Sequence, residues 1–286
     1  MKKHSLILYI IITLSPTLTL SQSKSEVGPF LGCSYYLGDL NTNMHFKSTK
    51  AGAGFVHRYV FNPHFSIKNS FYYGNVEADD ANSNDPIQRE RNLHFKSSIL
   101  DIATEIEFNF FPFQQGKSVG VSANGESYFA SPYVFVGISM FSFNPKTKYK
   151  SKWYELHPLG TEGQGTIAYP ERKKYALTQL CIPFGGGIKY NISKKANIAF
   201  EWGFRYTFTD YIDDVSTTYA NPMAISAEKG NIAKNLSDRS TNKTTLYENT
   251  ERQRGDSKTN DCYVFTGLIL TFKITNKYKE KKCVQQ

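Results

Sequence analysis

The chain has 286 residues, of which 40% are hydrophobic and 15% aromatic, and its formal net charge is +9. A mean hydropathy of -0.44, with no long apolar run after the N-terminus, excludes a membrane protein built from several helices. Its basic residues are scattered except in the C-terminal run at 277–282, and an exported chain rarely meets nucleic acid, so no nucleic-acid partner is expected.

The N-terminus has the pattern of a secretory signal. A basic start at Lys2 and Lys3 precedes an apolar stretch, and small polar residues begin at Ser21. We therefore expect a signal peptide over residues 1–21, a barrel over 22–275 and a basic periplasmic tail over 276–286. An uncleaved membrane helix is the alternative, but Pro16 interrupts the apolar run that a span requires.

Two later segments, residues 100–110 and 198–208, alternate between apolar and polar side chains. This period of two indicates strands with one apolar face, and each segment is long enough to cross a bilayer as a tilted strand. The opposite faces carry Glu105 and Glu107 in the first segment and Glu201 and Arg205 in the second.

Six further segments show weaker strand patterns: residues 27–37, 51–61, 65–74, 133–143, 177–190 and 262–274. Together these segments predict an all-β fold, a transmembrane antiparallel β-barrel of about eight strands. Pro29 and Pro183 lie inside two of them, where the missing N–H donor predicts a bulge or a bend.

The connections alternate in length. Tight polar turns follow Phe61 and Tyr190, whereas residues 74–93, 144–175 and 210–261 form long polar loops. Short periplasmic turns and long extracellular loops are typical of outer-membrane barrels, although residues 112–131 are too long for a periplasmic turn. The alternative is a soluble sandwich or lipocalin-like barrel, whose apolar faces would point inward.

Aromatic residues gather at the segment ends and predict two interfacial belts. The expected turn-side belt contains Phe61, Phe65, Phe110, Phe111, Phe113 and Tyr190, and the loop-side belt contains Tyr35, Tyr36, Tyr72, Tyr73, Tyr206, Phe208 and Tyr211.

If the apolar faces point to lipid, the four charged residues of the two clearest segments point into the lumen. An eight-stranded barrel is filled by its side chains, so Glu105, Glu107, Glu201 and Arg205 should form a charge network rather than line a pore. Arg58, Lys68 and Lys189 are its candidate partners.

The four cysteines do not have the spacing of a metal site. Cys33 and Cys262 fall on the first and last strands, which adjoin when a barrel closes, but we expect no disulfide between them. Cys283, in the tail, is the candidate for a crosslink to a partner.

No catalytic motif or phosphate loop connects the candidate acids and bases, so we expect a protein that is not an enzyme and has no cofactor, no metal and no small-molecule substrate. The run from Asp210 to Asp214 lacks the spacing of a Ca²⁺ loop and is expected to be a solvated turn. The candidate acids are Asp79, Asp80, Asp85, Asp210, Asp213 and Asp214, and the candidate bases are His45, His94 and His157.

Several strings resemble a Bacteroidota family of outer-membrane barrels of unknown function that includes PorG, a type IX secretion component. They are residues 30–39, 108–112, 131–135, 153–165, 182–185 and 208–216. The loop motifs are the specific ones, and they contribute Trp153, Gly160, Glu162, Gly163, Asp210, Asp213 and Asp214.

This resemblance implies a non-enzymatic barrel in the outer membrane of a Gram-negative bacterium. The protein would contact outer-membrane lipid and tether the periplasmic ring proteins of the type IX secretion system. Its expected contact surface consists of residues 112–131, 192–197 and 277–286. The first alternative is a surface binding or adhesion barrel that acts through its long loops. The second is a small barrel hydrolase.

Overall fold

The computed structural model describes residues 25–42, 46–113, 119–121, 127–128, 130–193, 195–242, 245 and 248–274. The expected signal peptide and basic tail, with Cys283, lie outside the described residues, as does His45.

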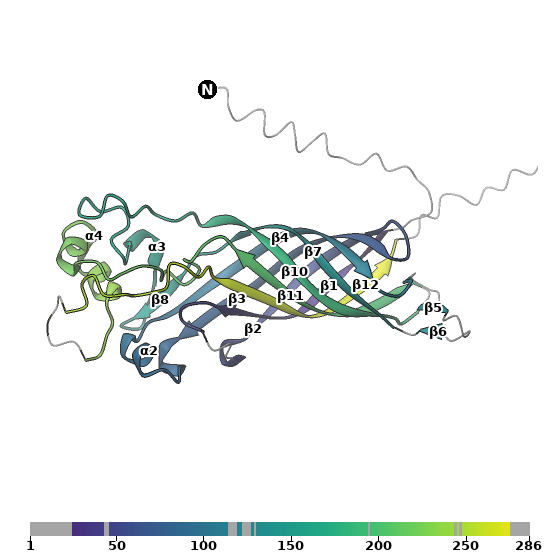
Figure 1. The fold of residues 1–286 in the computed structure, drawn as a ribbon, viewed down its shortest axis with the longest axis horizontal. Coiled ribbons are helices and arrows are strands. Elements are labelled where there is room, and N and C mark those ends of the chain that lie inside the picture. Colours follow the sequence, from purple (N-terminus) through teal and green to yellow (C-terminus); the bar gives the residue numbers. More distant parts are fainter. Residues whose placement is uncertain are drawn as a thin grey trace, which may run out of the picture.

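Eight long strands form one closed antiparallel barrel, as predicted (Figure 1). Each strand pairs with its neighbours along the chain, and β1 pairs with β12 to close the sheet, so every long strand has two partners. The strands are β1 (Ser25–Leu37), β2 (Lys50–Val60), β3 (Phe65–Asp79), β4 (His94–Asn109), β7 (Ala130–Ser142), β10 (Thr178–Asn191), β11 (Ala196–Thr207) and β12 (Cys262–Lys273).

Short elements cover both ends of the barrel. At the loop end lie η1 (Phe46–Ser48), η2 (Asp80–Asn82), α2 (Pro86–Arg91), β8 (Lys146–Tyr149), β9 (Lys152–Glu155), α3 (Leu156–Leu159) and α4 (Pro222–Ser237). The small hairpin of β5 (Val119–Val121) and β6 (Ser127–Tyr128) lies at the turn end, within the unusually long connection predicted at 112–131. None of the described helices has the length and apolar character needed to span a bilayer.

Strands β3 and β4 continue beyond the apolar segments from which they were predicted. Their pairing runs past the Tyr73–Leu100 pair to Asp79 opposite His94, so the connecting loop is shorter than residues 74–93. The outward positions beyond Tyr73 are polar, and a pattern based on apolar alternation cannot detect a strand there.

Of the bulge or bend predicted at Pro29 and Pro183, the bulge is absent at both positions. Val27 pairs with Phe272 and Phe30 with Ile269, so no extra residue is inserted across Pro29. Around Pro183 the register between β10 and β7 is likewise unbroken. Each proline stays paired in register with its other neighbouring strand, so the missing donor interrupts one ladder without shifting it.

The outward surface of the barrel is apolar and has aromatic side chains near both ends. Tyr73, Tyr206 and Phe208 are exposed toward the loops, and Phe65 and Tyr190 are exposed toward the turns. Four residues assigned to these belts are instead buried: Tyr35, Tyr36, Tyr72 and Phe113. For Tyr36 and Tyr72 the reason is parity, because residues at even spacing from Phe30 on β1 and from Lys68 on β3 point inward.

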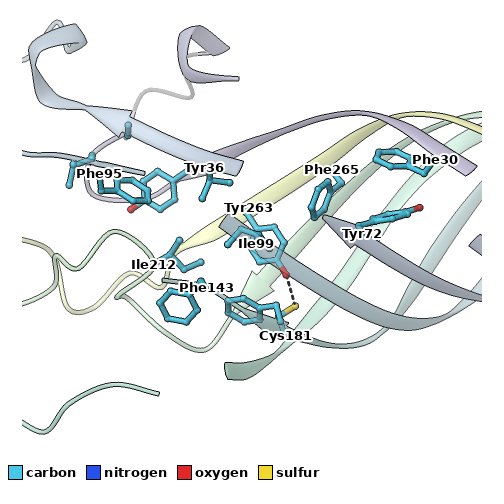
Figure 2. Close-up of a cluster of buried hydrophobic side chains, with 14 of the residues drawn as sticks. Phe30, Tyr36, Tyr72, Phe95, Ile99, Phe143, Cys181, Ile212, Tyr263 and Phe265 are labelled. Carbon is cyan, nitrogen blue, oxygen red and sulfur yellow. Dashed lines mark hydrogen bonds between the residues drawn. The ribbon is translucent and has the colours of Figure 1, made fainter. Parts of the chain in front are cut away.

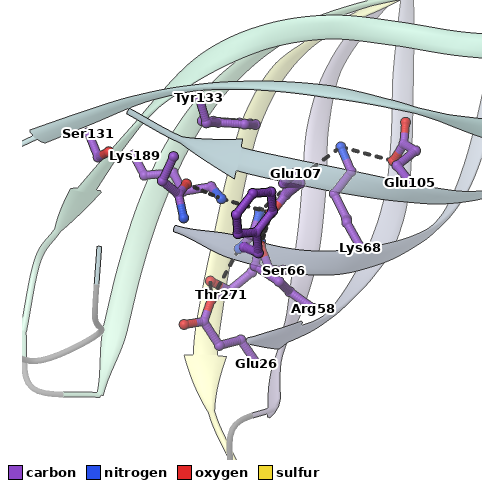
Figure 3. Close-up of polar contacts among 12 residues, drawn as sticks. Glu26, Arg58, Ser66, Lys68, Glu105, Glu107, Ser131, Tyr133, Lys189 and Thr271 are labelled. Carbon is purple, nitrogen blue, oxygen red and sulfur yellow. Dashed lines mark hydrogen bonds and ion pairs between the residues drawn. The ribbon is translucent and has the colours of Figure 1, made fainter. Parts of the chain in front are cut away.

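The interior has an apolar half and a charged half. Toward the loops, Tyr36, Phe95, Phe143, Tyr263 and Phe265 pack in an aromatic cluster (Figure 2). Toward the turns, charged side chains from several strands meet inside the barrel (Figure 3). A charged interior inside an apolar surface reverses the arrangement expected of a soluble sandwich.

Candidate functional site

The charged interior centres on Glu107, which lies on the inward face of β4. Its carboxylate accepts hydrogen bonds from Arg58 Nε at 2.7 Å and Nη2 at 3.1 Å, and from Lys189 Nζ at 2.7 Å. Ser66 Oγ also donates to it, at 2.7 Å. Two cations and a hydroxyl therefore satisfy one carboxylate that solvent does not reach.

A second centre forms around Lys68 on β3. Its ammonium group donates to Glu201 and lies 3.0 Å from Glu105 Oε2. Tyr133 Oη donates to the same Glu201 oxygen at 2.7 Å, and the Lys68 ammonium lies 4.1 Å from the centre of the Phe135 ring. Lys68 thus joins carboxylates from β4 and β11 across the interior.

Arg205 is held differently. Its guanidinium lies 3.6 Å from Asp101 and 3.8 Å from Glu105, beyond hydrogen-bond distance, and 5.5 Å from the ring centres of Tyr72 and Phe265. Asp101 instead accepts from Tyr263 Oη at 2.6 Å. Charge attraction and ring contact, rather than hydrogen bonding, hold this arginine in place.

We call these residues the lumen network: Glu26, Arg58, Lys68, Asp101, Glu105, Glu107, Lys189, Glu201 and Arg205. Glu105, Glu107, Glu201 and Arg205, the four residues expected to face inward, all belong to it. With Tyr133 on β7 and Thr271 on β12, which donates to Glu26, every long strand contributes a side chain. Lys68, Glu105, Glu107 and Arg205 are 0% exposed, which a water-filled pore at this level would not allow.

A second polar centre closes the loop end of the barrel, and it is built on Glu162. This side chain is fully buried, and its two oxygens accept from the main-chain N–H groups of Ser216 and Thr217. Arg254 Nη1 donates to it at 3.0 Å. Glu162 therefore joins the loop after α3 to both ends of the connection between β11 and β12.

Arg254 also connects Glu162 to Asp214. Arg254 also donates to the main-chain oxygen of Asp214 at 2.6 Å, while the Asp214 carboxylate accepts from Thr161 Oγ1 and Tyr175 Oη. Burial raises the pKa of Asp214 to about 6, despite the nearby Arg254 charge.

Tyr36, at the end of β1, lies between two carboxyl groups. Its hydroxyl oxygen is 2.7 Å from Asp213 Oδ2 and 2.6 Å from Asp261 Oδ1. One phenol carries one proton, so it can donate to only one of them, and the other contact requires a proton on Asp213 or Asp261. The geometry therefore calls for one protonated carboxyl group in this closed arrangement.

The pKa values of these acids agree with the requirement for one protonated carboxyl group. Burial, followed by the charge of Asp261, raises the pKa of Asp213, and burial raises the pKa of Asp261 to about 8. Asp210 is also buried, and its burial together with the charge of Asp261 raises its pKa to about 9. We call Tyr36, Glu162, Asp210, Asp213, Asp214, Arg254 and Asp261 the loop cap.

Two glycines of the resembling loop motif have positive φ angles, a backbone conformation that favours glycine. Gly160 has a φ of +58° and Gly163 a φ of +88°. A Cβ at Gly163 would also lie 2.6 Å from the Tyr169 ring, and one at Gly160 would lie 2.4 Å from Gln164 O. Both glycines hold the turn that carries Glu162 into the loop cap.

The expectation of a solvated turn at 210–214 is wrong, because Asp210, Asp213 and Asp214 are buried and the last two are hydrogen-bonded. Sequence reasoning missed Arg254, Asp261 and Tyr36 as their neighbours. Only the inward parity of Tyr36 could have indicated its position. Trp153, from the same resembling strings, lies apart from the loop cap on β9 and is half exposed.

The remaining candidates do not assemble a reactive centre in the described part of the chain. His157 contacts the main-chain oxygen of Tyr175, and His94 contacts Arg239 and the Lys148 amide, so neither is hydrogen-bonded to a carboxylate. Asp80 is paired with Arg91, while Asp79 and Asp85 cap short helices. The described His, Cys, Asp and Glu residues include no group of three or more placed to hold a metal ion.

Cys33 and Cys262 are not bonded to each other, as expected. Cys33 faces Thr266 across the seam, whereas Cys262 faces Leu37. Both are free, as is Cys181.

A family model described as "Domain of unknown function (DUF6089)" matches residues 3–235. The chain belongs to this family. No curated protein matches it.

Several solved barrels are similar to this DUF6089 chain over most of its length. The N-terminal β-barrel domain of Pseudomonas aeruginosa OprF is 11% identical, covering 89% of this chain and 100% of that one, with a TM-score of 0.37. Neisserial surface protein A is 7% identical, covering 89% and 99%, with a TM-score of 0.42. Ail of Yersinia pestis, in complex with the heparin analogue sucrose octasulfate, is 9% identical, covering 88% and 99%, with a TM-score of 0.39.

Proposed function

We propose that the protein is a non-enzymatic β-barrel of the outer membrane with a structural, tethering role in the type IX secretion machinery. The observation that carries the structural role is the lumen network. Solvent does not reach its central side chains, and it joins all eight long strands, so it favours a rigid plugged body over a conduit.

The outward surface supports the membrane location. Leu31, Phe71, Ile102, Ile138 and Phe200 are on different strands, and each is 46% exposed or more. Exposed side chains of this kind, encircling a closed barrel, are stable in hydrocarbon and unfavourable in water. The ladder has no open edge between the long strands, which is what a lipid environment requires.

The tethering role rests on the resemblance to the family that includes PorG. A plugged barrel offers a fixed periplasmic rim, and we propose that this rim binds periplasmic ring proteins of the secretion system. Its candidate surface consists of residues 112–131, 192–197 and 277–286, with Cys283 as a crosslinking residue.

Fractionation and a heat-modifiability gel test the location, because a closed barrel runs differently before and after boiling. We expect the protein in the outer-membrane fraction with a mobility shift. Recovery as a soluble periplasmic protein without a shift would refute the membrane location.

Deletion of residues 276–286 tests the tether. We expect this deletion to abolish pull-down of periplasmic ring proteins while the heat shift is retained, and Cys283→Ser to remove any disulfide-linked adduct on a non-reducing gel. Undiminished pull-down by the deleted protein would refute the tail as the contact.

The loop cap favours a second function, binding at the cell surface. Buried ion pairs hold the long loops to one another, as Glu162 with Arg254 shows, and a fixed surface loses less entropy on binding than mobile loops. Replacing residues 214–261 with a short linker should then abolish surface binding and leave periplasmic pull-down intact. Under the tethering function, deletion of the tail should instead abolish periplasmic pull-down and leave surface binding intact.

A further inference from the structure

An open hollow of about 600 Å³ lies at the loop end of the barrel, where the ladder between β10 and β11 ends. Cys181 and Thr207 form the last pair of that ladder, and the adjacent residues Leu180 and Phe208 line the hollow. Both of these apolar side chains are 57% exposed on the outward surface. The hollow therefore opens at the loop-side edge of the apolar surface, next to the aromatic belt.

Asp210 lies in the wall of this hollow. It is 7% exposed, and neither of its carboxyl oxygens has a hydrogen-bond partner in the described part of the chain. The Ser216 hydroxyl is close enough to lower the pKa of Asp210, but it makes no hydrogen bond of normal geometry with the carboxyl group. A buried polar group without a partner destabilises the fold, so its position in the wall of an open hollow points to a partner that binds from outside.

The charged groups that act most strongly on Asp210 are all carboxyl groups. Burial, followed by the charge of Asp261 and then by those of Asp39 and Glu162, raises the pKa of Asp210 to about 9. The empty hollow therefore holds a neutral acid at pH 7. A positively charged ligand would compensate for the surrounding carboxyl groups and allow Asp210 to ionise, whereas an uncharged ligand would not.

Aromatic rings form another part of the wall. Tyr175 and Tyr211 line the hollow and are stacked, with 4.7 Å between their ring centres. The Tyr175 hydroxyl donates to Asp214 and the Tyr211 hydroxyl to Glu162, so both hydroxyls are engaged in the loop cap and the rings remain for contact with a ligand. The face of an aromatic ring attracts cations, and aromatic side chains are the usual surroundings of a bound quaternary ammonium group.

We propose that this hollow binds an organic ammonium group, with the Asp210 carboxylate as its counter-ion and the rings of Phe208 and Tyr211 as its aromatic wall. Two sources can supply this group: the headgroup of an amine-bearing lipid in the surrounding membrane, and a soluble amine. The site is independent of the tethering role, and only its lipid source rests on the membrane location proposed above.

Choline binding to the full-length protein tests the site, with dimethylbutanol, the uncharged carbon analogue of choline, as the matched ligand. Calorimetric titration in nanodiscs of phosphatidylglycerol, a lipid without an amine, should show binding of choline and none of the analogue. Because the empty site holds a neutral acid, choline binding at pH 7 should release a proton. Titrations in buffers of different ionisation enthalpy measure that release.

Two variants test the residues of the site. Asp210→Asn keeps the size of the side chain and removes its charge, and Ser257→Trp fills the hollow from an exposed position in its lining. Each should weaken choline binding by about ten-fold or more, because a charge partner or its space is lost. Glu90→Gln is the matched control: it removes an exposed carboxylate on α2, outside the hollow, and should leave the affinity unchanged.

Nanodiscs of phosphatidylethanolamine distinguish the two sources. A lipid headgroup in the site competes with choline and lowers its apparent affinity, whereas a site for a soluble amine binds choline equally in both lipids. No choline binding to the wild type, equal binding of dimethylbutanol, or choline binding that is unchanged in both Asp210→Asn and Ser257→Trp would overturn the proposal. Loss of the heat shift in the wild type would instead mark failure of the membrane location.

Discussion

Glu107 shows how one residue can hold several strands of this barrel together. It accepts hydrogen bonds from β2 through Arg58, from β3 through Ser66 and from β10 through Lys189. A carboxylate with three such partners compensates for its own desolvation, but each cation in turn depends on it.

We predict that Glu107→Ala lowers the free energy of unfolding by about 3–5 kcal/mol, because it leaves Arg58 and Lys189 buried with too little negative charge. Urea unfolding of the barrel in lipid vesicles measures this change. Glu155→Ala is the matched control: its ion pair with Lys146 is about half exposed, and such pairs contribute roughly 0–1 kcal/mol. Similar losses in the two variants would contradict the role given to the lumen network.

Among the elements, the loops between strands behave as one unit. Arg91, at the end of α2, donates to Asp80 in its own loop, to the main-chain oxygen of Asp39 after β1, and to that of Arg254 before β12. Three connections far apart in sequence are joined by this side chain alone. The loop cap adds the connection after β7 through Glu162.

The loop cap should weaken as pH rises. Asp261 and Asp210 have pKa values of about 8 and about 9 in the closed structure, against about 4 when the loops are open and solvated. Their stabilising contribution is therefore complete below about pH 4, decreases above it and is lost as pH passes through 8 and 9. We predict faster proteolysis of residues 210–261 at pH 9 than at pH 6, with the barrel itself still resistant.

Asp261→Asn is the control for this effect, because a neutral amide can donate to Tyr36 and still accept from the Ile212 N–H. The variant should show a smaller difference between the two pH values. An unchanged difference would mean that other groups control loop opening.

At the scale of the whole molecule, a filled interior predicts that a substitution in the lumen network changes the stability of the barrel but not its permeability. Glu201 accepts from Lys68 and Tyr133 and is 1% exposed. We predict that Glu201→Leu lowers the midpoint of urea unfolding while liposomes containing it remain as impermeable to small solutes as those with the wild type. A conductance that appears or changes in Glu201→Leu would refute a plugged barrel.

The sequence alone predicted the eight strands and the inward position of Glu105, Glu107, Glu201 and Arg205. This was possible because the side-chain direction in a strand alternates with a fixed period of two. The sequence of a single strand is therefore enough to show which of its residues share a face. The same rule would have moved Tyr36 and Tyr72 out of the aromatic belts, had parity been applied to them. Apolar alternation could not reveal the loop-side ends of β3 and β4, because the outward residues there are polar.

Only the tertiary structure decided the loop cap. Glu162 and Arg254 are 92 residues apart, and Tyr36 and Asp261 are 225 apart, so their contact depends on barrel closure bringing all the loops to one end. Local periodicity contains no information about such distances, because it describes the face of a strand and not its neighbours.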